Sequence, residues 1–308
     1  MRFSQRIVPV RVLIVISVCR ARNDPIVPPV RGRRTSTASP RKGTRPMVHS
    51  PIMPGAEPFF ARGGPLGVVL MHGFTASPHE VLWWAQHLAG DGYTVYAPRL
   101  AGHGTNPRDM ARVRWQDWHA SAVDAYHVLA RQCERVVVGG LSMGAALSLI
   151  TAASCDVAGV MALAAPLVPF PNLSPRRLWF AKLFRPYTDQ TDRGPFAERV
   201  LAQQKERGER VLGRVRYGMW SSVAVEQLTY VMASALASLP DITAPVLAVY
   251  SKGDETVRPH HLDALKSGLS RSTRVETHLL ETSGHILTQD VEQETVFALT
   301  SAFAASLS

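Results

Sequence analysis

The chain has 308 residues, of which 46% are hydrophobic, and this is enough apolar sequence to form one large core. Its net charge of +10 is confined to one end, because residues 1–50 contain eleven Lys or Arg and one acidic residue. The remaining residues contain 23 of the 34 basic and 23 of the 24 acidic residues, so their net charge is zero. That neutral remainder gives no basis for binding nucleic acid, and three cysteines without ligand spacing predict reduced thiols and no metal site.

Residues 1–46 are rich in Arg, Pro, Ser and Thr and are predicted to be a disordered, basic N-terminal extension. Its one apolar run, Val12–Val18, is shorter than the roughly 20 residues that span a bilayer. No small-x-small cleavage site follows that run. We therefore expect a cytoplasmic protein, with translation from Met47 as one possibility. Membrane association or export through the basic arm is the alternative.

The first expected elements are a strand and a helix. Leu66–Met71 is a continuous apolar run, which indicates a buried strand. Ser77 and Glu80 have the spacing of a capping box, and Pro78 stands at the first helical position. We expect the helix to begin there and to end near Leu88.

The remaining elements alternate in type along the chain. Strands are expected over 93–98, 135–139, 157–167, 246–250 and 275–280, and helices over 115–133, 145–153, 260–269 and 290–307. Alternating helices and continuously apolar strands predict an α/β fold with a doubly wound, mostly parallel sheet over residues 47–308.

The alternation lapses between residues 169 and 239. This stretch is rich in aromatic residues and arginine, and a polar helix is expected near 195–212. An insertion of helices over the carboxyl edge of the sheet is the simplest interpretation. The sequence therefore predicts a small helical cap over residues 169–239.

A candidate nucleophile follows the apolar strand that contains Val136–Val138. Gly140-Leu141-Ser142-Met143-Gly144 fits the Gly-x-Ser-x-Gly pattern, and an alanine-rich helical segment comes next. A strained turn between strand and helix exposes the serine hydroxyl, and glycines allow the helix to approach the strand. The alternative is a glycine-rich strand end with an incidental serine.

An acid and a base are expected at the ends of later strands. Asp254 comes just after the strand over 246–250, and His285 comes just after the strand over 275–280. Carboxyl ends of parallel strands share one edge of the sheet, where such folds bind ligands. Ser142, Asp254 and His285 in this order predict a catalytic triad.

Other titratable residues compete for these roles. His260 and His261 are expected to be surface residues at the start of a helix. His72 is expected to fix its loop, and His103 to have a structural role in preference to lining a pocket. Glu255 neighbours Asp254, but its side chain should point elsewhere.

Backbone amides are expected to form an oxyanion hole beside Ser142. One donor is the N–H of Met143, the residue after the nucleophile, and the other comes from the loop after the strand 66–71. Phe74 is the residue expected to supply that second N–H.

Four stretches carry a resemblance to the bacterial monoacylglycerol lipase and small carboxylesterase branch of the α/β-hydrolases. They are His72-Gly73-Phe74-Thr75, Pro98-Arg99-Leu100-x-Gly102-His103-Gly104-Thr105, Gly140-Leu141-Ser142-Met143-Gly144 and Ser283-Gly284-His285-x-x-Thr288-x-Asp290. The resemblance extends from about Met53 to the C-terminus, with the cap as the least similar region. It implies a carboxylic ester hydrolase with a small lid, no cofactor, and an oxyanion hole at Phe74 and Met143.

The function expected from these observations is serine-dependent hydrolysis of carboxylic esters through an acyl-enzyme. The aromatic cap favours an apolar acyl group, so a monoacylglycerol or a short-to-medium-chain ester is the expected substrate. Residues that bind the substrate are not assigned. A thioesterase, amidase or acyltransferase with the same triad is the alternative, and so is a non-catalytic binding module on the same fold. Membrane contact through the basic arm is a further hypothesis.

Overall fold

The computed structural model describes residues 50–171, 173–190 and 194–308. Residues 47–308 group into one compact unit. The expectations for the basic extension over residues 1–46 lie outside the described residues.

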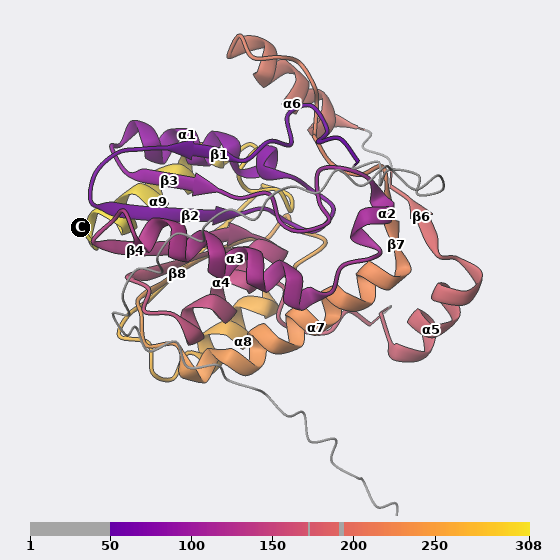
Figure 1. Ribbon diagram of the computed structural model, residues 1–308. Coiled ribbons are helices and arrows are strands. Elements are labelled where there is room, and N and C mark those ends of the chain that lie inside the picture. Colours follow the sequence, from indigo (N-terminus) through magenta and orange to yellow (C-terminus); the bar gives the residue numbers. More distant parts are fainter. Residues whose placement is uncertain (1–49, 172, 191–193) are drawn as a thin grey trace, which may run out of the picture. The chain divides into compact units, whose positions relative to one another are not determined.

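A seven-stranded sheet forms the centre of the fold (Figure 1), with the strand order β1-β3-β2-β4-β5-β8-β9. Its strands are β1 (Phe59–Ala61), β2 (Leu66–Met71), β3 (Thr94–Ala97), β4 (Arg135–Leu141), β5 (Gly159–Leu163), β8 (Val246–Ser251) and β9 (Val275–Leu280). The edge strand β1 is antiparallel to β3, and all the other neighbours in this sheet are parallel. Because β2, β5 and β8 are buried along their whole length, they have no polar alternation.

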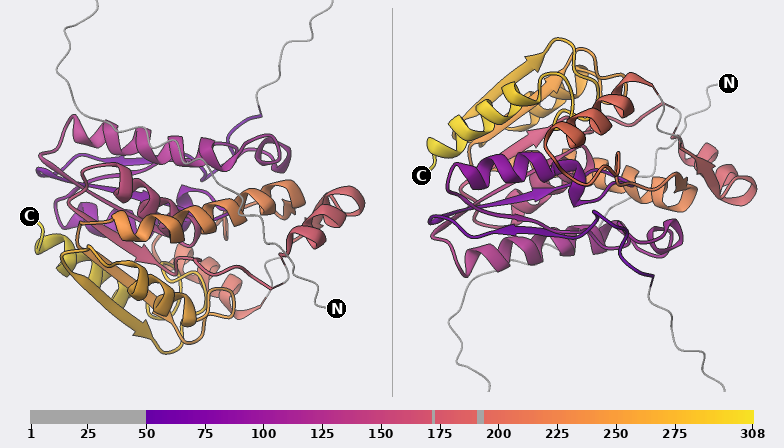
Figure 2. Two further views of the ribbon diagram at one scale, coloured as in Figure 1. Left: turned by 90° about the horizontal axis from the view of Figure 1, so that it is seen from below. Right: turned by 90° about the horizontal axis from the view of Figure 1, so that it is seen from above.

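Helices cover both faces of this sheet, with the strands between two helical layers (Figure 2). One layer contains α1 (Leu82–Gly90) and α9 (Gln293–Ala305), joined where the indole N–H of Trp84 donates to Thr300 Oγ1 at 2.9 Å. The other contains α3 (Trp115–Ala130), α4 (Met143–Ser154) and α8 (His260–Gly268); the short α2 (Pro107–Met110) precedes α3. The predicted doubly wound, mostly parallel α/β fold is confirmed.

The segment between β5 and β8 leaves the sheet and forms the cap, and its last α-helix returns to pack against α4. It contains α5 (Pro175–Phe184), β6 (Tyr187–Asp189), α6 (Pro195–Glu206), β7 (Met219–Ser221), α7 (Ser222–Ser238) and the 3₁₀ turn η2 (Leu239–Asp241). β6 and β7 form a separate antiparallel pair. Figure 1 shows α5 and α6 projecting beyond the ends of the central strands.

Two expected boundaries differ from the observed ones because the chain enters the left-handed region. The helix expected over 195–212 ends at Glu206, and Gly208 follows with a φ of 67°. The strand expected over 157–167 ends at Leu163, since Ala164 has a φ of 47°. A left-handed residue cannot continue either element.

One helical stretch, Ser222–Asp241, is long and apolar enough to cross a membrane by length and composition. In the structure this stretch packs against α4, and its side chains Ala224, Val231 and Ala235 are fully buried. Burial therefore accounts for one face of this helix, whereas Val223, Tyr230 and Leu236 are exposed.

The expected capping box at Ser77 and Glu80 is wrong. Ser77 makes no capping hydrogen bond and instead donates from Oγ to the carbonyl of Val215, in the cap, at 2.7 Å. Glu80 accepts a hydrogen bond from the N–H of Gly73 at 2.8 Å. A 3₁₀ turn, η1 (Pro78–Val81), precedes α1 at this point. The side chains of Ser77 and Glu80 make tertiary contacts and do not cap a helix.

Gly144 is expected to tolerate no side chain. A Cβ atom there would lie 2.0 Å from the carbonyl oxygen of Met71, a backbone atom that cannot move aside. Gly144→Ala should lower the free energy of unfolding by at least about 3 kcal/mol in urea denaturation.

Gly90→Ala is the matched control, because a Cβ at this position in α1 meets nothing within 4 Å. This change should leave stability unchanged or raise it by up to about 1 kcal/mol. Equal stability of the two variants would contradict the close approach of α4 to β2.

Candidate active site

Ser142 occupies a strained turn between β4 and α4. Its backbone has φ 56° and ψ −119°, a region that residues other than glycine rarely adopt. The N–H of Ser142 donates to the carbonyl of Leu163 at 2.8 Å, which ties the turn to the neighbouring strand. The observed geometry is that of a serine projecting from a strand-to-helix turn.

The structure brings Ser142, His285 and Asp254 together in one chain of hydrogen bonds. His285 Nδ1 lies 2.7 Å from Asp254 Oδ2, and His285 Nε2 lies 2.9 Å from Ser142 Oγ. An ionised carboxylate only accepts hydrogen bonds, so Nδ1–H donates to Asp254. The lone pair on Nε2 is then free to accept the serine proton, which is the arrangement that activates a hydroxyl nucleophile.

Asp254 is held by the backbone as well as by His285. Its side chain is 0% exposed, and Oδ1 accepts hydrogen bonds from the N–H groups of Thr256 and Val257 at 2.8 Å each. These donors satisfy the buried charge and fix the carboxylate plane. The neighbouring Glu255 is exposed and lines the cavity over Ser142, but the carboxylate that contacts His285 Nδ1 is that of Asp254.

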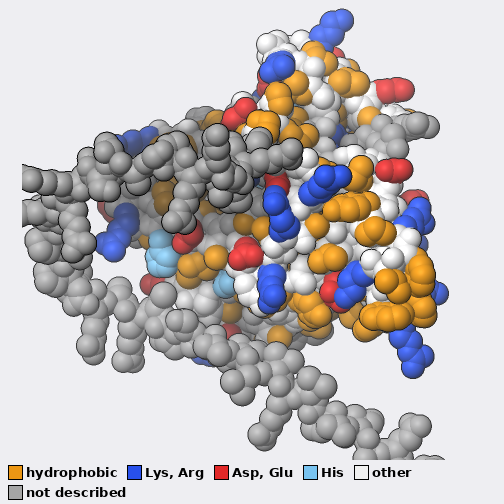
Figure 3. Space-filling view, turned by 45° about the vertical axis from the view of Figure 1, so that its right-hand side comes forward, with side chains coloured by type: hydrophobic (Ala, Val, Ile, Leu, Met, Phe, Trp, Pro, Cys, Tyr) orange, Lys and Arg blue, Asp and Glu red, His pale blue; other side chains and the backbone are white. Residues whose placement is uncertain are grey.

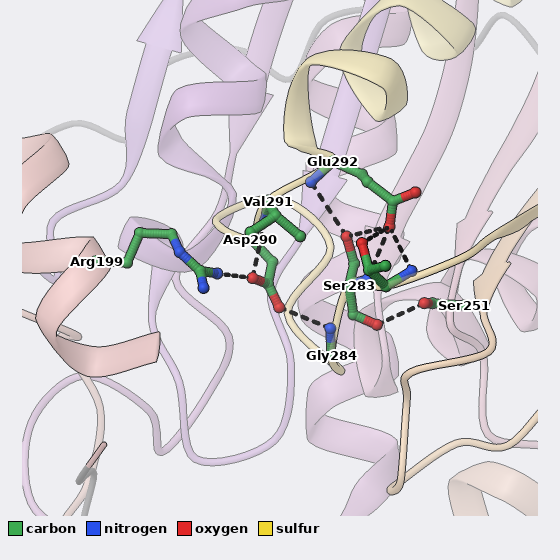
Figure 4. A network of polar contacts seen from close by, with 8 residues as sticks. Arg199, Ser251, Ser283, Gly284, Asp290, Val291 and Glu292 are labelled. Atoms are coloured by element: carbon green, nitrogen blue, oxygen red, sulfur yellow. Dashed lines mark hydrogen bonds and ion pairs between the residues drawn. The ribbon is translucent and has the colours of Figure 1, made fainter. Parts of the chain in front are cut away.

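Glu292 fixes the loop that leads to His285 (Figure 4). Its carboxylate accepts hydrogen bonds from the N–H groups of Glu281, Thr282 and Ser283 and from the Ser283 hydroxyl. Partial burial raises the pKa of Glu292, but these backbone donors outweigh it and lower the pKa to about 2. The loop is therefore anchored by a carboxylate that stays charged at neutral pH.

The two residues expected to form the oxyanion hole lie on either side of Ser142. Met143 is the first residue of α4, and the first N–H groups of a helix have no acceptor within it. Phe74 follows β2 and lines the same cavity as Ser142, and its ring packs edge-on against Trp118 at 5.9 Å between centroids. Their role as donors to an oxyanion stays a prediction.

A cavity of about 1150 Å³ opens over Ser142 and His285. Its apolar lining comes mostly from the cap and includes Phe170, Leu173, Leu178, Phe196, Val225 and Leu228. Its charged lining includes Arg177, Arg214, Arg216, Arg258, Glu80, Glu255 and Asp290. Among the residues that the structure describes, no three His, Cys, Asp or Glu side chains are grouped as metal ligands.

His72 and His103 have structural roles, as expected. His72 Nε2 accepts the N–H of Leu100 at 3.2 Å, and its Nδ1 lies 2.9 Å from the carbonyl of Gly73. His103 is completely buried, and its Nδ1 lies 3.0 Å from the carbonyl of Ala101. Both rings therefore support the loops next to the site without reaching Ser142.

The expectation that His261 is a surface residue is wrong, whereas His260 is exposed. His261 is 1% exposed, and its Nδ1 accepts the N–H groups of Leu167 and Val168 at 2.9 and 3.0 Å. Burial lowers the pKa of His261 to about 4, helped by the neighbouring His260, so the ring stays neutral as an acceptor. The sequence carries no local signal for this contact across 93 residues.

Comparison with known proteins agrees with this geometry. The profile of the Alpha/beta hydrolase family matches residues 68–299. The chain is 35% identical to the thermostable monoacylglycerol lipase of Bacillus sp. (strain H-257), over 79% of this chain and 92% of that protein. It is 23% identical to a carboxylesterase of Bacillus subtilis (strain 168), over 78% of this chain and 92% of that protein.

A solved structure described as one of two metagenome-derived lipolytic enzymes, LipS and LipT, superimposes with a TM-score of 0.73. The two sequences are 32% identical, and the superposition covers 83% of this chain and 100% of that structure's chain. The expected family and fold are confirmed by these matches.

Burial of His103 should make stability depend on pH. Desolvation lowers the pKa of His103 from 6.5 to about 4, against the raising effect of the Ala101 carbonyl. Below pH 6.5 the unfolded chain binds a proton that the folded ring does not bind until about pH 4. The free energy of unfolding should therefore fall by about 3 kcal/mol across this window.

Urea denaturation between about pH 7 and about pH 4 would measure this dependence. His103→Asn should flatten the slope, whereas the exposed His127→Asn on α3 should leave it unchanged. An unaltered slope in His103→Asn would contradict the assignment.

Proposed function

The chain belongs to the alpha/beta-hydrolase family, and on that premise we propose that it is a serine carboxylic ester hydrolase. The observation that carries this proposal is the hydrogen-bonded series from Ser142 through His285 to the buried Asp254. A hydroxyl, a neutral imidazole and a charged carboxylate in this order are the parts that acyl transfer requires.

In the first step, Ser142 Oγ attacks the ester carbonyl while His285 Nε2 takes the hydroxyl proton. Asp254 stabilises the imidazolium that forms and keeps the ring oriented. The amides of Phe74 and Met143 stabilise the oxyanion, each by roughly 3–4 kcal/mol. His285 then donates its proton to the leaving alcohol, and Ser142 carries the acyl group.

In the second step, water replaces the alcohol. His285 takes a proton from the water, which attacks the acyl carbonyl, and the oxyanion forms at the same amides. Collapse of this intermediate releases the carboxylic acid and returns the proton to Ser142. Both steps thus use the same groups in the same positions.

We propose that the substrate is a monoacylglycerol or a short-to-medium-chain acyl ester. The cavity of about 1150 Å³ is large, and the side chains that the cap adds to it are mostly apolar, which suits an acyl chain. The names of the relatives from Bacillus, a monoacylglycerol lipase and a carboxylesterase, support the same substrate class. A thioester or an amide substrate, or transfer of the acyl group to an alcohol, is the alternative.

The outer face of α5 supports a lipid substrate presented at an interface. Trp179, Phe180, Leu183 and Phe184 are exposed to 57, 56, 61 and 75%. Figure 3 shows hydrophobic side chains interspersed with Lys and Arg on the face of the molecule that includes the cap. Two exposed arginines, Arg176 and Arg177, lie in this helix, and the exposed Arg185 follows its last residue. We propose that these seven residues, the α5 surface, contact an anionic lipid aggregate.

Ser142→Ala should reduce the hydrolysis of 1-lauroylglycerol by about four orders of magnitude or more, because the variant lacks the hydroxyl that carries the acyl intermediate. The measurement is fatty-acid release by the full-length protein, beside thioester and amide analogues. Ser154→Ala, at the far end of α4, is the matched control and should retain full activity. Equal rates in Ser142→Ala and the parent would exclude the serine mechanism.

Replacing Trp179 and Phe184 together by serine should weaken binding to phosphatidylglycerol vesicles by about tenfold or more. Each substitution removes apolar side-chain surface that would be buried in the lipid. Vesicle sedimentation at low and high salt would measure it. Val128→Ser, which removes a similarly exposed apolar side chain from α3, should have no effect. Binding that is equal for parent and double variant would contradict the role of the α5 surface.

A further inference from the structure

Two carboxylates hold the backbone immediately before a catalytic group, and each is paired with an arginine of the cap. The first is Asp290, whose Oδ2 accepts the N–H of Gly284 at 2.7 Å, one residue before His285. Its Oδ1 forms an ion pair with Arg199, which reaches in from α6 (Figure 4). The Asp290 side chain is 9% exposed.

The second carboxylate, Glu80, makes the equivalent contact with the loop after β2. Its Oε2 accepts the N–H of Gly73 at 2.8 Å, one residue before Phe74. Its Oε1 lies 3.2 Å from the guanidinium of Arg214, in the cap segment after α6. Both side chains are largely buried, with 6% exposure for Glu80 and 11% for Arg214.

A nearly buried carboxylate keeps its charge only if donors and a cation surround it. Removing the arginine leaves that charge uncompensated, and the carboxylate then moves toward water. This movement weakens the hydrogen bond to Gly73 or to Gly284. Displacement of a reacting group by about 1 Å costs about 100-fold in rate, so these contacts matter for catalysis as well as for stability.

Further contacts dock the same cap segment onto the loop after β2. The N–H of Tyr217 donates to the carbonyl of Thr75 at 3.0 Å, and Thr75 has a left-handed φ of 66°. Gln204 Nε2 lies 3.0 Å from His79 Nε2. Arg199, Arg214 and Tyr217 thus connect the cap to the support of the loops that carry His285 and Phe74.

We infer that Arg199 and Arg214 are positioning residues, which couple docking of the cap to the geometry of the base and of the oxyanion hole. Arg199 acts through Asp290 on the His285 loop, and Arg214 acts through Glu80 on the Phe74 loop. The expected effect on rate rests on the proposed function. The effect of the two arginines on the order of the Phe74 and His285 loops can be measured without any enzymatic activity.

Arg199→Met and Arg214→Met in the full-length protein test the inference. With p-nitrophenyl butyrate, a substrate too short to depend on the outer cap, kcat per labelled active site should fall about 10- to 100-fold, with KM changed less than about threefold. Arg199→Lys and Arg214→Lys keep the charge and should recover most of kcat. A purely structural role would lower the melting temperature without this split between kcat and KM.

Arg207→Met is the matched control. Arg207 also docks the cap, with its guanidinium over the ring of Trp83 and 3.0 Å from Gln86 Oε1, but both contacts are on helix α1. This variant should keep the parental kcat. If Arg199→Met and Arg214→Met also keep kcat within about twofold, the inference is overturned.

A double variant covers the case in which an arginine variant folds poorly. Glu80→Gln removes the buried charge and leaves an amide oxygen that can accept the N–H of Gly73. In that background Arg214→Met should cost less than about twofold further in kcat. A further loss of tenfold or more would show that Arg214 acts by another route and would overturn its part of the inference.

Hydrogen exchange separates failure of this inference from failure of the proposed function. Peptides containing residues 73–75 and 284–286 should exchange faster in Arg214→Met and Arg199→Met respectively, and at the parental rate in Arg207→Met. Faster exchange in a protein that hydrolyses no ester would refute the proposed function alone. Unchanged exchange and kcat in an active protein would refute the inference alone.

Discussion

The close approach of α4 to the end of β2 is the constraint on which the rest of the site depends. The backbone at Gly144 comes so near the carbonyl of Met71 that a Cβ would lie 2.0 Å from it. This contact forces the sharp turn at Ser142 and places the start of α4 beside the loop that contains Phe74. Since the seven-stranded sheet is mostly parallel, the loops carrying Asp254 and His285 reach the same edge.

Three carboxylates that accept backbone N–H groups give these loops a fixed geometry. Glu292 anchors the loop before His285 from a partly exposed position, whereas Asp290 and Glu80 are paired with arginines from the cap. Each carboxylate accepts backbone N–H groups, which are donors that a loop outside regular structure would otherwise leave unsatisfied. The cap therefore has parts with different surroundings. Arg199 and Arg214 pair with the carboxylates that hold the catalytic loops, α7 packs on α4, and α5 presents aromatic side chains outward.

The sequence predicted the placement of the candidate site residues correctly where they closely follow a strand. Ser142, Asp254 and His285 each follow an apolar strand, and the structure places them within hydrogen-bonding distance. It was a poor guide wherever a side chain reaches a distant segment. Ser77 and Glu80 have capping-box spacing, but Glu80 contacts a residue 134 positions away. His261 likewise binds backbone amides far away in the chain, and no local pattern distinguishes it from a surface histidine.

The sequence by itself determined the alternation of strands and helices, the strained serine turn and the order of nucleophile, acid and base. These features depend on local periodicity and on glycine geometry, which short stretches encode. The tertiary structure alone decided which carboxylates support the catalytic loops, which histidines are buried and which cap arginines reach inward. The contacts of His261, Arg199 and Arg214 join residues 91 to 134 positions apart, and only the folded chain brings such residues together.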